Sequence, residues 1–143
     1  MRKFREAGIV LGLFCFVCVL ANADAKAQTI YFPVYNLALK SGESAELADV
    51  YYISTDCKSL LKATPEVEIL DGPPGVTAAI KEEKIVPRTF GCTKPVPGGK
   101  LMVTASEVEE YGRARMVLRI KMKTSQGERQ YSKDVNISLI PRE

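Results

Sequence analysis

Apolar and polar residues alternate with a period of two along most of the chain after residue 28, the pattern of β-strands that bury one face. The longest example covers residues 113–124, where every second residue from Met116 to Met122 is apolar. Basic side chains occupy most of the positions between them. This stretch therefore predicts a long strand with one face toward a core and the other toward solvent.

Six other stretches predict strands by the same criterion, and they cover residues 29–39, 45–54, 66–70, 76–86, 100–105 and 130–140. Pro33 interrupts the first stretch, as in an edge strand, and the period of the second slips at Ala48 and Asp49, as at a β-bulge. Residues 76–86 also fit a helical piece, but their β-branched ends favour a strand. In the last stretch, Tyr131 is expected to face the core.

Turn-forming residues separate these stretches. The strongest signal is at residues 71–75, and residues 125–128 predict the hairpin between the last two strands. Residues 87–99 hold three prolines and three glycines, so they predict an irregular connection. Residues 106–109 match a capping box, which predicts a single helical turn. The whole pattern predicts an all-β sandwich of seven or eight antiparallel strands.

The first 25 residues have the three parts of a secretory signal peptide. Three basic residues come within the first five, residues 8–20 form an apolar run of 13 residues, and Ala23 and Ala25 provide an A-x-A cleavage site. A membrane-spanning helix needs about 20 apolar residues, so a retained signal anchor is the weaker interpretation. We expect cleavage after residue 25, or alternatively after Ala27, and no stable membrane anchor in the mature chain.

The remaining residues, 26–143, are expected to form a single domain. The apolar fraction of 46% is that of a globular protein. The net charge of +3, from 20 basic and 17 acidic residues, is too small to indicate nucleic acid as a partner. The chain contains no histidine, which removes the commonest general base and the commonest metal ligand.

Cys57 and Cys92 are the only cysteines outside the apolar run, which holds Cys15 and Cys18. Exported chains fold in an oxidising compartment, so these two residues predict one disulfide. A zinc site or a redox site is the weaker interpretation, because the chain has neither a histidine nor a C-x-x-C motif. We therefore expect no metal and no cofactor.

Several residues lie at predicted turns or next to predicted strands: Gly42, the turn at 73–75, Gly98 and Gly99, Tyr111, and Gly127 followed by Tyr131. In these features the chain resembles the bacterial immunoglobulin-like modules of exported and surface proteins, over most of residues 29–140. The resemblance implies an immunoglobulin-like β-sandwich that binds other proteins or acts as a spacer. The chain departs from antibody-type domains because it has no tryptophan and because Cys92 lies in a predicted loop. We therefore expect the disulfide to tie two loops at one end, and not to cross the core.

A row of basic residues on the solvent face of the longest predicted strand comprises Arg113, Arg115, Arg119, Lys121 and Lys123. Such a ridge predicts docking of an anionic partner, such as lipopolysaccharide, an acidic glycan or an acidic protein. The alternative is a solvated sheet face whose charges pair with Glu128 or Asp134 across the hairpin.

Tyrosines crowd the first two predicted strands, and Tyr51 and Tyr52 must point to opposite faces. At least one of them is expected on the surface, where tyrosine is a favoured anchor for protein contacts. Tyr51 is therefore a second candidate for partner binding, although a half-buried strand residue is an equally good interpretation.

Other residue groups that carry chemistry elsewhere do not predict a catalyst in this chain. The acidic pairs at residues 82–83 and 107–110 lie in polar stretches, where carboxylates are solvated. Met116 and Met122 are six residues apart on the apolar face, about 20 Å along a strand, so they are core residues and cannot share an ion. We therefore do not expect an enzyme.

These observations predict an exported, non-catalytic binding or structural module of the bacterial cell envelope, periplasmic or secreted. Its partner is expected to be a protein or an anionic envelope component that docks on the sheet face. The alternative is a small carrier or inhibitor that presents the loop at residues 87–100 to an enzyme or a ligand, since a bridge would hold that loop rigid.

Overall fold

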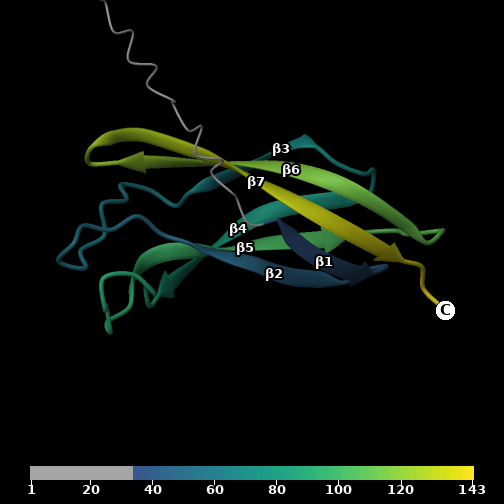
Figure 1. The fold of residues 1–143 in the computed structure, drawn as a ribbon, viewed down its shortest axis with the longest axis horizontal. Coiled ribbons are helices and arrows are strands. Elements are labelled where there is room, and N and C mark those ends of the chain that lie inside the picture. The colour runs from purple at the N-terminus through teal and green to yellow at the C-terminus, as the bar shows by residue number, and fades with distance from the viewer. Residues whose placement is uncertain (1–33) are drawn as a thin grey trace, which may run out of the picture. The chain divides into compact units, whose positions relative to one another are not determined.

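The computed structural model describes residues 34–143, and these residues form seven β-strands and no helix (Figure 1). The strands are β1 (Tyr35–Lys40), β2 (Ser44–Val50), β3 (Glu66–Asp71), β4 (Val76–Ile85), β5 (Val96–Ala105), β6 (Gly112–Thr124) and β7 (Gly127–Ile140). The all-β prediction is confirmed. The predicted signal peptide, its cleavage sites and residues 29–33 of the first predicted strand lie outside the described residues.

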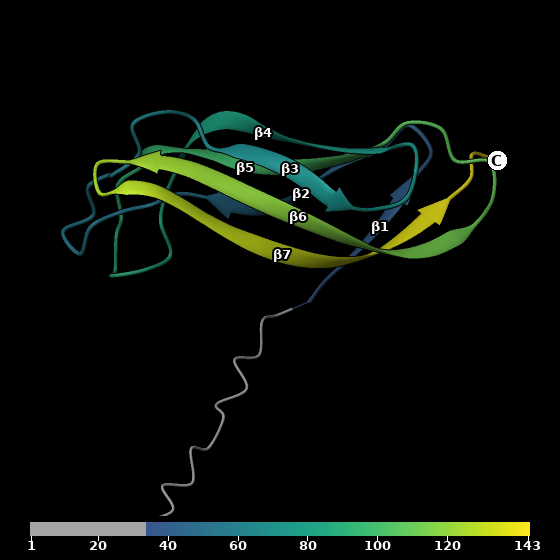
Figure 2. The ribbon, with the colours of Figure 1, turned by 90° about the horizontal axis from the view of Figure 1, so that it is seen from above.

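The strands of the described region form two sheets. One has the order β1-β7-β6-β3 and the other the order β2-β5-β4, and Figure 2 shows them as two layers. The pairs β6–β7, β3–β6, β2–β5 and β4–β5 are antiparallel, but β1 runs parallel to β7. The prediction of antiparallel strands throughout is therefore wrong for β1, because hydrophobic alternation carries no information about the direction of pairing.

The core lies between the two sheets and draws apolar side chains from both. Its buried members are Leu39, Val50, Val76, Leu101, Val103, Ala105, Met116, Leu118, Ile120, Met122, Val135, Ile137 and Leu139. The predicted inward set of β6 is thereby confirmed. Tyr131 lies on the predicted inner face, directly opposite Ile120, but it is 37% exposed and does not belong to the buried core. β1 joins β7 only from Val135 onward, so Tyr131 lies on the half of β7 that β1 leaves uncovered.

β2 follows its prediction at the bulge and departs from it at the end. The register between β2 and β5 shifts between Glu46 and Ala48, next to the position where the hydrophobic period slips. The strand ends at Val50, whereas the sequence predicted an end at residue 54. The chain turns back on itself here, because the Leu60 N–H donates to the Tyr52 carbonyl oxygen at 2.8 Å.

The helical turn predicted after residue 105 is absent from the described chain, where residues 106–111 form an irregular connection. The Ser106 hydroxyl donates to the Gly75 carbonyl oxygen at 2.8 Å, and the Ser106 N–H donates to the same oxygen, also at 2.8 Å. An N-cap serine at position 106 would accept a hydrogen bond from the N–H of Val108 or Glu109, but the Val108 N–H donates instead to the Ser41 hydroxyl oxygen at 3.0 Å, so the helical turn does not form.

Strand β5 begins at Val96, four residues before the predicted start, and includes Gly98 and Gly99. Both glycines are buried, and neighbouring strands approach them closely. A Cβ at Gly98 would lie 2.6 Å from the carbonyl oxygen of Val50, and one at Gly99 would lie 2.9 Å from that of Lys81. These glycines allow close packing in a central strand. The prediction that they belong to the irregular connection at residues 87–99 is therefore wrong.

We predict that Gly98→Ala lowers the free energy of unfolding by about 1–3 kcal/mol, because the added methyl group meets rigid backbone. The matched control is Gly112→Ala, also in a strand, where an added Cβ meets no atom within 4 Å. The control is expected to stay within about 1 kcal/mol of the parent protein. Urea denaturation of both variants measures the difference, and equal stabilities would contradict the close approach.

Candidate functional site

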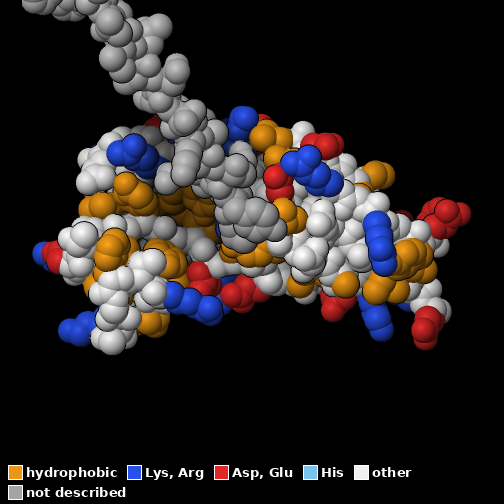
Figure 3. Space-filling model, viewed as in Figure 1, with side chains coloured by type: hydrophobic (Ala, Val, Ile, Leu, Met, Phe, Trp, Pro, Cys, Tyr) orange, Lys and Arg blue, Asp and Glu red, His pale blue; other side chains and the backbone are white. Residues whose placement is uncertain are grey.

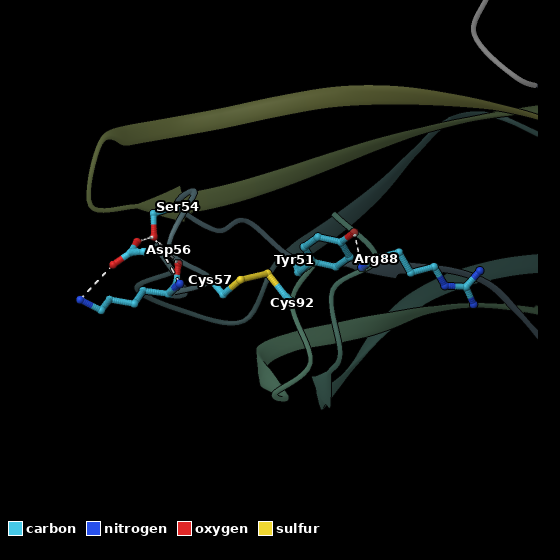
Figure 4. Close-up of a disulfide and its surroundings, with 7 residues drawn as sticks. Tyr51, Ser54, Asp56, Cys57, Arg88 and Cys92 are labelled. Atoms are coloured by element: carbon cyan, nitrogen blue, oxygen red, sulfur yellow. Dashed lines mark hydrogen bonds and ion pairs between the residues drawn. A yellow bond between two sulfur atoms is a disulfide. The ribbon is translucent and has the colours of Figure 1, made fainter. Parts of the chain in front are cut away.

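Cys57 and Cys92 form a disulfide with an S–S distance of 2.03 Å, as predicted (Figure 4). Cys57 lies in the connection between β2 and β3, and Cys92 in the connection between β4 and β5. The bond therefore ties two irregular loops and crosses neither sheet. Both loops lie at the left end of Figure 1, and the described C-terminus lies at the opposite end.

The connection that carries Cys57, residues 51–65, is also held by the β6–β7 hairpin. The Ser125 N–H donates to the Leu60 carbonyl oxygen at 2.9 Å, and the Lys62 N–H donates to the Lys123 carbonyl oxygen at 2.8 Å. The Tyr52 hydroxyl adds a hydrogen bond to Gln126 at 3.2 Å. This connection is therefore fixed along one side by backbone hydrogen bonds before the disulfide is counted.

A small polar cluster closes the tip of this connection. The Ser54 hydroxyl donates to the Asp56 carboxylate, and the Lys58 ammonium lies 3.0 Å from the same carboxylate. These two partners, the hydroxyl first, hold the pKa of Asp56 below its ordinary value. The cluster shapes the turn that presents Cys57 to its partner.

The second connection, residues 86–95, has fewer anchors. Pro87 is buried, and the Arg88 N–H donates to the Tyr51 hydroxyl oxygen at 3.3 Å (Figure 4). The Cys92 N–H donates to the Thr89 carbonyl oxygen at 3.3 Å, which closes the tip on itself. The disulfide is the covalent link between this tip and the hairpin-bound connection.

Two non-glycine residues of the described chain have a left-handed backbone, and both belong to this end. Cys57 has a φ of 62° and Phe90 a φ of 56°. Such a conformation is disfavoured for a side chain that carries a Cβ, and it persists only where surrounding structure imposes it. Gly91, with a φ of 65°, continues the left-handed turn. Phe90 and Gly91 are the central residues of the turn that the Cys92 N–H closes on the Thr89 carbonyl oxygen. This hydrogen bond and the disulfide at Cys92 therefore constrain the backbone at Phe90.

Phe90 is the most exposed large hydrophobic residue of the described chain, with 62% of its surface accessible. Val86, at the other end of the same loop, is 50% exposed. Lys94 in the same loop is also exposed, whereas the Arg88 side chain points away from the disulfide and lines a hollow with Glu46 and Asp49 (Figure 4). Figure 3 shows hydrophobic side chains beside lysine and arginine side chains at this end of the molecule. An exposed aromatic side chain on a loop that also carries an exposed lysine is a chemically suitable surface for a protein contact.

The predicted basic face exists, but carboxylates pair with most of its centre. Arg115 lies 2.9 Å from Asp134 on β7, and Glu68 on β3 lies 2.8 Å from Lys121 and 3.7 Å from Arg119. The Lys121 ammonium lowers the pKa of Glu68, so this carboxylate is ionised at neutral pH. Glu68 was missed from the sequence because its strand could not be placed beside β6 without the fold.

The remaining predicted site residues take different positions. Lys123 is exposed at the hairpin end of the same face and forms no ion pair among the described residues. Glu128 lies opposite Lys123 in the register but forms no ion pair within residues 34–143 either, so only the Asp134 alternative is confirmed. Tyr51 is half-buried, and its hydroxyl oxygen accepts a hydrogen bond from the Arg88 N–H, so it anchors the connection at residues 86–95.

Comparison with known proteins adds no relative: no protein-family model and no curated protein matches this sequence. In residues 34–143, no group of three or more Cys, Asp or Glu side chains is arranged to hold a metal ion. Within the same residues, no helix has the length and hydropathy needed to span a bilayer. A closed disulfide is consistent with an oxidising compartment.

We predict that replacing both cysteines by serine lowers the free energy of unfolding by about 3–4 kcal/mol, because the bond closes a chain segment of 35 residues. Urea denaturation of the mature protein measures the loss. Reducing the parent protein with a thiol should give the same stability as the double variant, since both lack the same bond. A change below about 1 kcal/mol would mean that the two loops are held without it.

Proposed function

We propose that this protein is an exported, non-catalytic binding module of the cell envelope, and that it contacts a protein partner through the loop tip at Phe90. The observation that carries the proposal is the exposure of this aromatic side chain on a loop tied by a disulfide. A side chain held in its binding orientation loses less conformational freedom when a partner binds. Aromatic residues are also among the residue types that dominate binding energy at protein interfaces.

The strand order supports the proposal that the two sheets form an immunoglobulin-like sandwich. In that fold, the second, fifth and fourth strands of the core set share one sheet, and the third, sixth and seventh share the other. Here β2-β5-β4 and β3-β6-β7 are arranged in this way, with β1 added to β7. Loops at the ends of such sandwiches are common binding surfaces. This likeness supports a binding role and does not identify a partner.

The loop tip is favoured over the basic sheet face because carboxylates pair with the central cations of the sheet face but not with the lysine of the loop. On the sheet face, Glu68 and Asp134 neutralise the central cations, so little net positive potential is left to steer an anionic partner. On the loop, the exposed Lys94 forms no ion pair among the described residues. A partner with an apolar pocket and an acidic rim fits this surface.

We predict that a photoreactive phenylalanine analogue at position 90 forms one discrete covalent adduct with an envelope protein in living cells. The residue it replaces is aromatic and exposed, so the fold should tolerate the change. The measurement is gel analysis of the tagged protein after irradiation, followed by mass spectrometry of the adduct.

Two control positions make this test specific. Tyr111 is also an exposed aromatic residue, at 58%, but it lies in the connection between β5 and β6, and it should give no protein adduct. Arg119 lies on the basic sheet face. An adduct at position 119 and none at position 90 would transfer the binding role to the sheet face, and adducts at all three positions would indicate non-specific contact.

A further inference from the structure

A second surface lies on the outer face of the sheet β1-β7-β6-β3, near the strand ends opposite the hairpin. A groove of about 550 Å³ crosses β1, β7 and β6 there. Its lining consists of Asn36, Leu37, Ala38, Arg113, Ala114, Arg115, Asn136, Ile137 and Ser138. This described lining contains two arginines, two asparagines and no carboxylate, so it suits a polar ligand that carries negative charge.

The strand register explains why the surface is hollow at this point. Asn36 and Arg115 both lie opposite Asn136, and Ala38 and Arg113 both lie opposite Ser138. Because directly opposed residues share a face of a sheet, these side chains form two neighbouring rows of three on the outer face. The small side chains of Ala38 and Ser138 form the floor of the second row, between taller amide and guanidinium groups.

Arg113 is the cation of this groove that has no carboxylate partner in the described chain. Arg115 is paired with Asp134 at 2.9 Å, whereas Arg113 takes part in no ion pair within residues 34–143. Its Nε donates instead to the Tyr111 hydroxyl oxygen at 3.0 Å, which leaves the terminal nitrogens of the guanidinium for another partner. A guanidinium in this state binds a carboxylate through two parallel hydrogen bonds.

The two asparagines supply hydrogen-bonding groups of both kinds. The Asn136 amide nitrogen donates to the Asn36 side-chain oxygen at 3.2 Å, which fixes the pair side by side. One amide nitrogen and one amide oxygen are left to face the groove, and the Ser138 hydroxyl can both donate and accept. Neighbouring hydroxyl groups of a sugar also donate and accept, so they match this set. Tyr111 is 58% exposed and is held beside Arg113, where its ring can pack on the apolar side of a sugar ring.

We propose that this groove binds a saccharide unit that carries a carboxylate, such as a uronic acid of an envelope polysaccharide. Arg113 takes the carboxylate, and Asn36, Asn136 and Ser138 take the ring hydroxyls. The site goes beyond the protein-binding function proposed above and does not depend on it, because it uses neither loop of the disulfide. A module with both sites would connect a protein partner to an acidic polysaccharide.

The test is an NMR titration of the ¹⁵N-labelled mature protein with trigalacturonate as the probe. Binding should shift the amide signals of Asn36, Asn136 and Ser138. Arg113→Gln should weaken binding at least tenfold, because it removes the carboxylate partner and keeps a polar side chain. The matched control is Lys81→Gln, an exposed cation of β4 in the other sheet, which should change the affinity less than twofold.

Two further probes separate saccharide recognition from attraction of any anion. The methyl ester of trigalacturonate lacks the charges and should bind at least tenfold more weakly to the parent protein. Citrate, a carboxylate without a sugar ring, should not shift the asparagine signals. The proposal is overturned if the ester binds as well as the acid, if citrate binds as well as the saccharide, or if Arg113→Gln and Lys81→Gln weaken binding equally.

Discussion

The disulfide between Cys57 and Cys92 is the constraint on which the distinctive end of this protein depends. The sheets supply their own stability, because their apolar faces bury a common core. The two long connections beyond the strand ends contribute little to this core: Tyr52 and Leu61 pack against it, and Pro87 is buried. One is fastened to the hairpin by backbone hydrogen bonds, and the bridge fastens the other to it. The bond thereby joins the less anchored loop to the loop that the hairpin holds, and the joined loops carry an exposed aromatic residue.

The long hairpin of β6 and β7 serves the rest of the molecule in a different way. Its inner face supplies much of the core, and its outer face is a regular grid of polar side chains. In the centre of this grid, opposite charges meet across strands and cancel. Toward the strand ends opposite the hairpin turn the grid has no carboxylate, and there it leaves Arg113 beside two amides and a small hydroxyl. One sheet face thus has paired charges at its centre and, near the strand ends, polar side chains without a carboxylate among them.

The sequence predicted the local features that depend on hydrophobic alternation and on turn-forming residues. It predicted the inner face of β6, the bulge of β2, the hairpin turn and the disulfide between two loops, because each follows from neighbouring residues or from the presence of only two cysteines after residue 25. It could not predict Glu68 as the partner of Lys121, since that contact joins two residues that are more than 50 positions apart in the chain. It also missed the groove at Arg113, which exists only because β1 lies beside β7 in parallel. The predicted helical turn is absent because the Val108 N–H, which the cap would need, donates to Ser41 in a distant part of the chain.

Amide hydrogen exchange of the mature protein, with the disulfide intact and after reduction under native conditions, tests the central claim most directly. Exchange reports how far each segment is protected by local structure. The account predicts that residues 86–95 lose their protection on reduction, most clearly at the Cys92 amide, while the amides of β6 and β7 stay protected. If residues 86–95 kept their protection without the bond, or if β6 and β7 lost theirs with the loop, the disulfide would not be what holds the Phe90 surface in place.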